Sequence, residues 1–97
     1  MRDIGFLDPA WTEMMEATRY YNEQSKNLGG RFLDSVHALA KKVQTFPESG
    51  RVVHKNVRQR LVSGWPYALL YEIEEKRITI VAVMHQKRTP DYWYHRL

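Results

Sequence analysis

The chain has 97 residues, of which 43% are hydrophobic and 27% are charged. These values exclude a two-domain enzyme, for which the chain is too short, and a disordered chain, which would hold fewer hydrophobic residues. The absence of cysteine excludes disulfides, thiolate metal sites and a cysteine nucleophile, and it is compatible with a cytoplasmic protein.

The net charge of +4 is unevenly distributed along the chain. Residues 1–50 hold 6 basic and 7 acidic side chains, whereas residues 51–97 hold 9 basic and 4 acidic ones. The basic excess of the second half suits a phosphate backbone, an acidic protein partner or solubility alone. No stretch approaches the ~18 apolar residues of a membrane-spanning helix, and the N-terminus lacks the pattern of a signal peptide. We therefore expect neither export nor membrane insertion.

The beginning of the chain predicts a short strand followed by a helix. Residues 2–7 are typical of a strand that ends at Asp8 and Pro9, where aspartate caps a helix and proline suits its first position. From Pro9 to about Leu28, apolar residues recur at the spacing of one helical face, as Ala10, Met14, Ala17 and Tyr21.

A second amphipathic helix is predicted over residues 31–45, with an apolar face made of Phe32, Val36, Leu39 and Val43. We expect Gly29 and Gly30 to end the first helix, because glycine readily adopts the left-handed conformation of a C-terminal cap. So short a break predicts an antiparallel helical hairpin, with the carboxylates of Glu13 and Glu16 on its solvated side.

After residues 46–50 the apolar period changes from that of a helix to that of a strand. A strand at residues 57–62 places the side chains of Arg58 and Arg60 on the same face, because side chains alternate along a strand. Two guanidinium groups are therefore expected side by side.

Residues 67–73 and 77–84 predict a β-hairpin around a charged turn at 74–76. The second of these strands is apolar on both sides and is expected to be central. Its two faces are predicted to carry Ile78, Ile80, Ala82 and Met84 on one side and Val81 and Val83 on the other. The pattern as a whole predicts a single α+β domain over residues 1–97, with a helical hairpin packed on a small antiparallel sheet.

Common phosphate-binding and metal-binding motifs are missing from the sequence. No glycine-rich phosphate-binding motif is present, and the four histidines lack the spacing of metal ligands. We therefore expect neither a metal nor a cofactor. What remains is a basic and aromatic cluster made of Arg58, Arg60, His85, Lys87, Arg88, Tyr92, Tyr94, His95 and Arg96.

This cluster lies on one side of the sheet if the strands pair as the hairpin indicates. Arginine binds phosphate, histidine or tyrosine transfers protons, and aromatic rings stack on bases, which are the parts of a metal-free ribonuclease. The same residues also fit a basic rim that serves solubility. In that interpretation Trp93 packs the C-terminal segment onto the core, and His85 is an ordinary residue at the end of a strand.

Five segments follow one another in a distinctive order: Gly50-Arg51, Val57-Arg58, Trp65–Tyr71, Ile78–His85 and Arg88–Arg96. With the helix before them, they resemble the RelE/ParE superfamily of toxins from type II toxin–antitoxin systems, and within it the subgroup called plasmid stabilisation proteins. The resemblance covers nearly the whole chain. It implies a β-α-α-β-β-β arrangement, which agrees with the elements predicted from periodicity.

Several candidate site residues follow from this resemblance. Arg88 matches an arginine that follows the last strand of RelE-like toxins, and Tyr94 matches their C-terminal catalytic tyrosine. Arg58 and Arg60 resemble an alternating basic pair on the preceding strand. Taken together with the basic and aromatic cluster, which adds His85, Lys87 and Arg96, the candidate catalytic residues are Arg88, Tyr94 and His85, and the candidate target-binding or nucleic-acid-binding residues are Arg58, Arg60, Lys87 and Arg96.

One position departs from the pattern of the RelE-like toxins. They carry a catalytic arginine where this chain has Ala68, so a charge that stabilises the transition state is missing unless Arg60 or Lys87 replaces it. Loss of one such group commonly costs about a hundredfold or more in rate. Together with His85 and Pro90, this departure favours a ParE-like member.

RelE-like members cut mRNA on the ribosome, ParE-like members poison DNA gyrase, and both are neutralised by a cognate antitoxin. We expect a cytoplasmic, ParE-like gyrase inhibitor that binds an antitoxin, as a homodimer or as a heterotetramer with it. A RelE-like endoribonuclease and a degenerate homologue that only binds the antitoxin stay open. Three apolar side chains of the first helix fit either a docking surface or the core, namely Trp11, Met15 and Tyr20.

Overall fold

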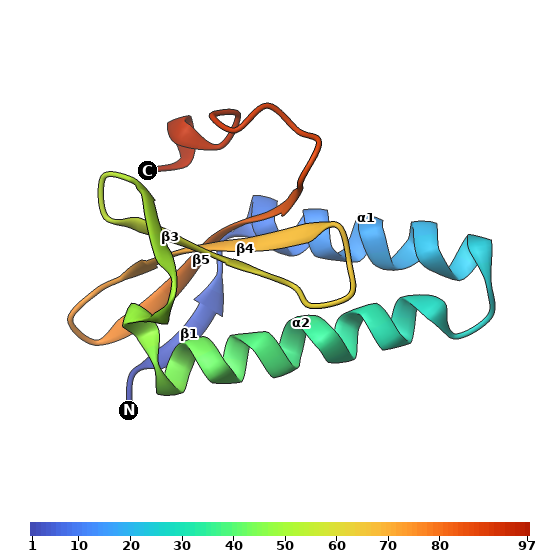
Figure 1. Cartoon of the computed structure of the whole chain (residues 1–97), viewed down its shortest axis with the longest axis horizontal. Helices are drawn as coiled ribbons and strands as arrows, with labels where there is room; N and C mark the ends of the chain where they lie inside the picture. Colours follow the sequence, from blue (N-terminus) through green and yellow to red (C-terminus); the bar gives the residue numbers. More distant parts are fainter.

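The computed structural model, which describes residues 1–97, packs two helices on a five-stranded mixed sheet (Figure 1). The predicted α+β class is confirmed. In chain order the elements are β1 (Asp3–Phe6), α1 (Asp8–Gln24), α2 (Leu28–Thr45), η1 (Pro47–Ser49), β2 (Arg51–His54), β3 (Val57–Leu61), β4 (Tyr67–Ile73), β5 (Arg77–His85) and η2 (Tyr94–Arg96), where η marks a short 3-10 helix.

The strands lie in the order β1-β5-β4-β3-β2. β1 is parallel to β5, and the other pairings are antiparallel. β5 is an interior strand, as its apolar faces predict. The sequence prediction misses β2, because this strand has only four residues, of which two are apolar. The antiparallel part of the sheet is therefore one strand wider than expected.

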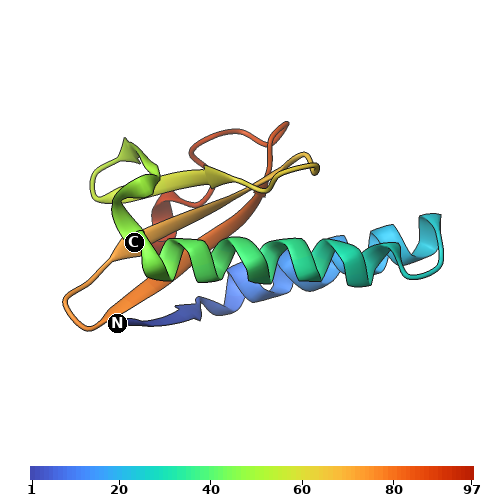
Figure 2. The same cartoon turned by 60° about the horizontal axis from the view of Figure 1, so that its bottom comes forward.

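Each helix buries the face that its apolar period predicts. The buried side chains include Ala10, Met14 and Ala17 of α1 and Phe32, Val36, Leu39 and Val43 of α2. The two helices lie side by side against the sheet, and the C-terminal segment crosses the sheet on the side away from α2 (Figures 1 and 2). Neither helix is both long and apolar enough to cross a bilayer.

The break between the helices is not at Gly29 and Gly30, as the sequence predicts. α1 ends at Gln24, and the chain reverses at Asn27, whose φ of 68° lies in the left-handed region that asparagine tolerates. Gly29 is instead the second residue of α2, where an added Cβ would lie 2.3 Å from the carbonyl oxygen of Thr18. This glycine is needed because the two helices touch there.

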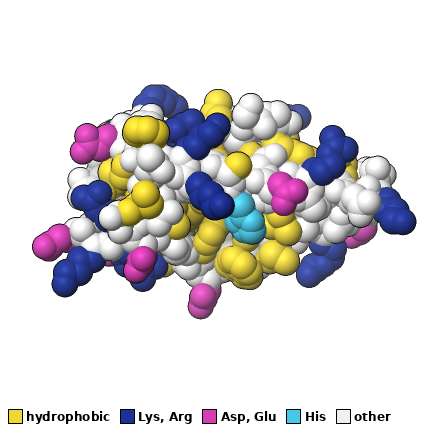
Figure 3. Space-filling view, turned by 90° about the horizontal axis from the view of Figure 1, so that it is seen from below, with side chains coloured by type: hydrophobic (Ala, Val, Ile, Leu, Met, Phe, Trp, Pro, Cys, Tyr) yellow, Lys and Arg dark blue, Asp and Glu magenta, His cyan; other side chains and the backbone are white.

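The exposed side of the helical hairpin carries large apolar side chains. Trp11 is 49% exposed and Tyr20 is 57% exposed, whereas Met15 is half-buried. Figure 3, which views the molecule from the side of α2, shows further hydrophobic side chains gathered between basic ones. Trp11 and Tyr20 therefore belong to the surface and not to the core.

The sheet has an apolar cluster on each face. On the helix side, Leu69, Tyr71 and Ile80 pack with the buried residues of both helices. On the opposite side, Trp93 packs with a smaller cluster that includes Leu70 and Met84. Trp93 is 1% exposed, so the interpretation that it fastens the C-terminal segment to the core is confirmed.

A β-bulge in β5 corrects the predicted alternation of its side chains. Leu70 pairs with Ala82 and Tyr71 pairs with Ile80, so Val81 has no residue opposite it on β4. An extra residue exchanges the two faces beyond the bulge. The helix side consequently carries Ile78, Ile80 and Val83, while Ala82 and Met84 join the cluster around Trp93.

Candidate functional site

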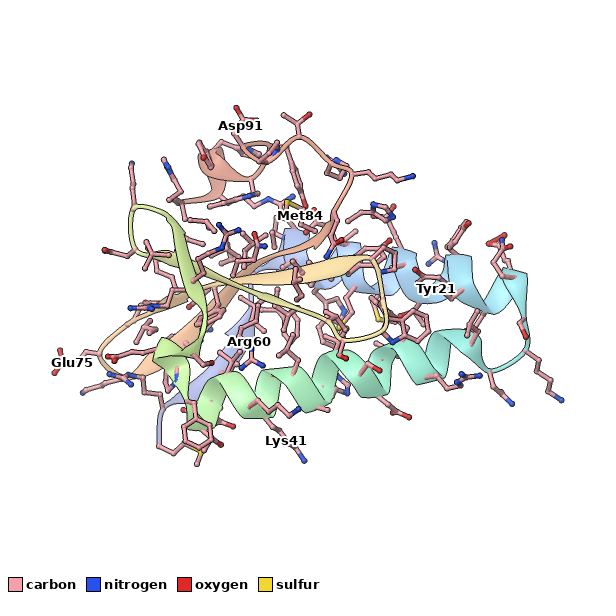
Figure 4. All side chains as sticks on the ribbon, in the orientation of Figure 1. Tyr21, Lys41, Arg60, Glu75, Met84 and Asp91 are labelled. Atoms are coloured by element: carbon pink, nitrogen blue, oxygen red, sulfur yellow. The ribbon has the colours of Figure 1, made fainter.

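Arg58 and Arg60 share one face of β3, as predicted, but that face is turned toward α2. Arg58 pairs with Tyr71 and Arg60 pairs with Leu69. Residues directly opposite in an antiparallel pair point to the same side, and both partners belong to the helix-side cluster. Figure 4 shows Arg60 between the sheet and α2.

The two arginines fasten the connection between α2 and β2. Nη1 of Arg58 donates hydrogen bonds to the carbonyl oxygens of Gly50, at 2.9 Å, and of Glu48, at 3.2 Å. Nη1 of Arg60 donates to Oγ of Ser49, at 2.9 Å. The prediction of a single surface that joins these arginines to the C-terminal residues is therefore wrong. The C-terminal segment (residues 86–97) packs on the other side of the sheet.

The hollow that does contain C-terminal candidates lies on that other side, between β2, β3 and the C-terminal segment. We call it the groove; its volume is about 380 Å³. Its floor is apolar and includes Leu70, Met84 and Trp93. Its polar rim consists of Arg51, Gln59, Gln86, Arg88 and Tyr94, with no aspartate or glutamate among the lining residues.

The ring of Tyr94 is held at the groove by stacking. It lies parallel to the imidazole of His54, with 3.7 Å between the ring centroids and 7° between the planes. Tyr94 remains 38% exposed. Stacking fixes the ring while leaving the phenol within reach of a ligand in the groove.

Arg88 lies where the groove meets a second hollow beside α1. Its Cζ is 3.9 Å from the centroid of the Tyr92 ring, a cation–π contact that orients the guanidinium group. Arg88 lines both hollows. Among the candidate catalytic residues, it is therefore the one that connects the two sites.

We call the second hollow the cleft; its volume is about 290 Å³. It contains His85 together with Glu16, Tyr20 and Tyr67. Nδ1 of His85 accepts a hydrogen bond from the amide of Lys87, at 3.1 Å, and the Lys87 side chain is exposed. His85 and Tyr94 line different hollows, so the structure does not bring the three candidate catalytic residues together.

A buried carboxylate holds the C-terminal segment in place. Glu13 of α1 accepts hydrogen bonds from Oη of Tyr92, at 2.5 Å, and from Nη1 and Nη2 of Arg96, at 2.9 and 3.0 Å. It also accepts one from the amide of Val83, at 3.0 Å, and Arg96 donates to the carbonyl oxygen of Val81, at 3.1 Å. We call Glu13, Tyr92 and Arg96 the tail lock.

The tail lock corrects two predictions. Glu13 does not lie on a solvated helix face, because only 14% of its side chain is exposed. Arg96 is not placed to bind a target, because its side chain is 10% exposed and its charge is compensated by Glu13. Their pairing joins residues 83 positions apart, a separation at which helical spacing carries no information.

The titration of the tail lock follows from its burial and its hydrogen bonds. Burial raises the pKa of Tyr92, and the hydrogen bond with Glu13 raises it further. The hydrogen bond with Glu13 also raises the pKa of Arg96 above its usual value. The phenol therefore stays protonated and the guanidinium stays charged at neutral pH, the states that this geometry requires.

Three residues in the groove or beside it are not found from the sequence. Arg51 lines the groove and His54 stacks on Tyr94, and both belong to β2, the strand that the apolar pattern does not reveal. Gln59 reaches the groove because it alternates with Arg58 and Arg60 along β3. The only available signal is this alternation, which identifies the residues on the opposite face without saying which face is open.

Ala68 lies on the groove side of the sheet and contributes no charge. It pairs with Met84 on one strand and with Leu61 on the other, and it is 0% exposed. The missing arginine is not replaced by Arg60, which points to the other side of the sheet. No group of three or more histidine, aspartate or glutamate side chains is arranged to hold a metal ion.

Comparison with known proteins agrees with this architecture. The family model described as the ParE toxin of the type II toxin–antitoxin system, parDE, matches residues 4–90. The chain therefore belongs to the ParE family of type II toxin–antitoxin toxins. This membership confirms the resemblance to the RelE/ParE superfamily.

Among solved structures, one described as the chromosomal ParDE TA system from P. aeruginosa is similar to this chain, with a TM-score of 0.67. The match covers 88% of this chain and 96% of that chain at 16% sequence identity, which establishes a common fold. No curated protein sequence matches the chain.

Proposed function

We propose that this protein is a ParE-like toxin that inhibits growth by acting on DNA gyrase and is neutralised by a cognate antitoxin. Membership of the ParE family carries the proposal. Inhibition of an enzyme by binding requires a complementary surface and no chemistry from the toxin itself. Ala68 is buried and supplies no charge for transition-state stabilisation, which favours this function over RNA cleavage.

The groove is the surface that we assign to the target. Arg51 and Arg88 stand on its rim without an acidic neighbour in the lining. Two guanidinium groups that form no ion pair within the chain, above an apolar floor, suit an acidic protein surface, because arginine binds carboxylates in bidentate fashion and stacks on apolar or aromatic groups. Tyr94 adds an ordered aromatic ring of the kind that is enriched at protein interfaces.

Two exposed aromatic side chains of α1 are candidate contacts for the antitoxin. Trp11 and Tyr20 are both exposed, although large aromatic side chains are usually buried. Exposed aromatic groups of this size commonly mark contacts with a partner. Neither side chain lines the groove, so the antitoxin and the target need not contact the same residues.

We expect expression of the chain alone to stop growth, with replication failing before translation. Purified protein should block supercoiling by DNA gyrase and cause cleaved DNA to accumulate. Replacing Arg51 and Arg88 together by alanine should weaken inhibition by at least about a hundredfold, since each charged contact contributes about 1.5–3 kcal/mol. Arg19→Ala, an exposed change on α1, is the matched control and should leave inhibition unchanged. Normal growth together with unimpaired supercoiling would refute gyrase as the target.

A second function has its own supporting observation. Arg51, Arg88 and Tyr94 converge on an acid-free groove, and the ring of Tyr94 is ordered by His54. A phosphate held by the arginines would place Tyr94 in position to act as a general acid or base. This arrangement favours ribosome-dependent mRNA cleavage as the alternative, although without the charge at position 68.

If mRNA is the target, Tyr94→Phe should reduce cleavage on ribosomes by at least about a hundredfold, because general acid–base catalysis contributes about 10²–10⁴ in rate. Phenylalanine keeps the stack on His54, so the fold and antitoxin binding should be unaffected. Tyr20→Phe, which removes a phenol outside the groove, is the control. Cleavage that survives in Tyr94→Phe would remove the catalytic role. Antitoxin binding without activity in either assay would identify a degenerate homologue.

A further inference from the structure

A third hollow lies between α2, the end of β3 and the turn that follows it. It is lined by Ser35, Ala38, Lys42, Arg60 and Ser63, among others, and its volume is about 160 Å³. We call it the niche. Arg60 lies between the sheet and α2, whereas Met84 of the groove points to the C-terminal segment (Figure 4). The niche is therefore separated from the groove by the sheet.

The folding of two elements brings the polar residues of the niche together. Ser35, Ala38 and Lys42 are spaced by three and four residues on α2, so they form one stripe along the helix. Arg60 faces that stripe because its partner Leu69 points to the helix side. The small side chain of Ala38 leaves the space between them open.

The polar groups around the niche are hydrogen-bond donors with unused capacity. Oγ of Ser35 accepts a hydrogen bond from Nε1 of Trp65, at 3.0 Å, so its own proton is free to be donated. Arg60 uses one of its five N–H groups in the bond to Ser49. The amide of Ser63 donates to no acceptor within the chain. A ligand that accepts several hydrogen bonds would satisfy these groups.

The charges at the niche are positive and uncompensated. The structure contains one ion pair, between Glu13 and Arg96, and it is remote from Lys42 and Arg60. No aspartate or glutamate lines the niche, in contrast to the cleft, which contains Glu13 and Glu16. Two cations at the rim of one hollow repel each other, and an anion between them removes that repulsion.

We propose that the niche binds a phosphate group. A tetrahedral dianion accepts hydrogen bonds in several directions, which matches a guanidinium, an ammonium, a hydroxyl and a backbone amide around one hollow. The volume is several times the roughly 30 Å³ that one water molecule occupies in the liquid, so an ion of this size fits. The proposal concerns the opposite face from the groove and does not depend on which target the toxin has.

The test is a titration of the purified protein with inorganic phosphate at constant ionic strength, followed by the amide resonances of Ser63 and Gly64. We expect saturable shifts and a rise in Tm with phosphate, because a ligand that binds only the folded state stabilises it. Lys42→Gln should weaken binding by about tenfold, the effect of losing one charged contact. Arg60→Gln should weaken it by at least as much.

Lys41→Gln is the matched control, since it removes the same charge from the neighbouring exposed residue of α2, which lines neither the niche nor the groove, and should leave the affinity unchanged. The Lys42 side chain is exposed and forms no hydrogen bond or ion pair, so Lys42→Gln will fold even if Arg60→Gln does not. Shifts that do not saturate, or equal weakening by Lys41→Gln, would overturn the proposal. So would equal affinity for acetate, which would assign the niche to carboxylates.

A parallel titration with a nucleoside monophosphate distinguishes the sources of the phosphate group. Affinity equal to or tighter than that of inorganic phosphate supports a niche that accepts the phosphate of a larger molecule, because the hollow opens to solvent beside the exposed Lys42. Binding of inorganic phosphate alone supports the free ion as the ligand. Either result supports a phosphate site in the niche. If Lys42→Gln abolishes the resonance shifts caused by both ligands, both ligands bind at the niche.

Discussion

Replacing Glu13 by alanine is expected to lower the free energy of unfolding by about 3 kcal/mol, the typical cost of removing one partner from a buried ion pair. The change leaves the guanidinium of Arg96 10% exposed and without a counter-charge. It also removes the acceptor for Oη of Tyr92 and for the amide of Val83. The substitution therefore removes the contacts of both Tyr92 and Arg96 with α1.

Urea unfolding of the purified protein measures this effect, and Glu16→Ala is the matched control. Glu16 is one turn away on the same helix, is exposed and accepts no hydrogen bond, so its replacement should change stability by less than about 0.5 kcal/mol. Glu13→Gln, which keeps an acceptor for Val83 but loses the charge, should lie between the two. Equal stability of Glu13→Ala and Glu16→Ala would mean that the tail lock contributes nothing.

Replacing Gly29 by alanine is expected to cost about 2 kcal/mol, within the range for inserting a methyl group into a tightly packed contact. The new Cβ would lie 2.3 Å from the carbonyl oxygen of Thr18 and 2.7 Å from Cγ of Asn22. The first of these atoms belongs to the backbone of α1 and cannot rotate away. The helices must therefore separate, which also strains the hydrogen bond that Oδ1 of Asn22 accepts from the amide of Gly29, at 2.8 Å.

Gly30→Ala is the matched control, because it makes the same substitution at a position where the new Cβ does not contact α1. A Cβ at Gly30 meets no atom within 4 Å, and alanine favours a helix over glycine by about 0.5–1 kcal/mol. Thermal unfolding should consequently show a lower Tm for Gly29→Ala and an unchanged or higher Tm for Gly30→Ala. Similar shifts in the two variants would show that helix propensity, and not the approach of α1, decides the role of Gly29.

Much of the fold is predictable from the sequence, because the periods of the apolar residues differ between helices and strands. The helical faces and the hairpin of β4 and β5 follow directly from these periods. The errors have local physical causes. Asn27 takes the left-handed conformation in place of glycine, and one extra residue at Val81 exchanges the faces of β5 beyond it.

The candidate site is less predictable, because it depends on which side of the sheet is covered. Alternation shows that Arg58 and Arg60 share a face, but β4 is apolar on both faces and does not reveal which one the helices cover. The register places both arginines against α2 and leaves the opposite face to Arg88 and Tyr94. Contacts between distant residues, such as Glu13 with Arg96, have no signal in local spacing at all.

The distance along the chain between Glu13 and Arg96 has a consequence for the order of folding. Their contact joins residues 83 positions apart, whereas the hairpin of β4 and β5 and the helical hairpin close short loops. Long loops cost more entropy to close and slow the contacts that depend on them. The hairpins should therefore form first, and the wall of the groove built by residues 86–97 should be added last and open first. Amide hydrogen exchange should therefore be faster in residues 86–97 than in the hairpin of β4 and β5, so that the groove is completed late in folding.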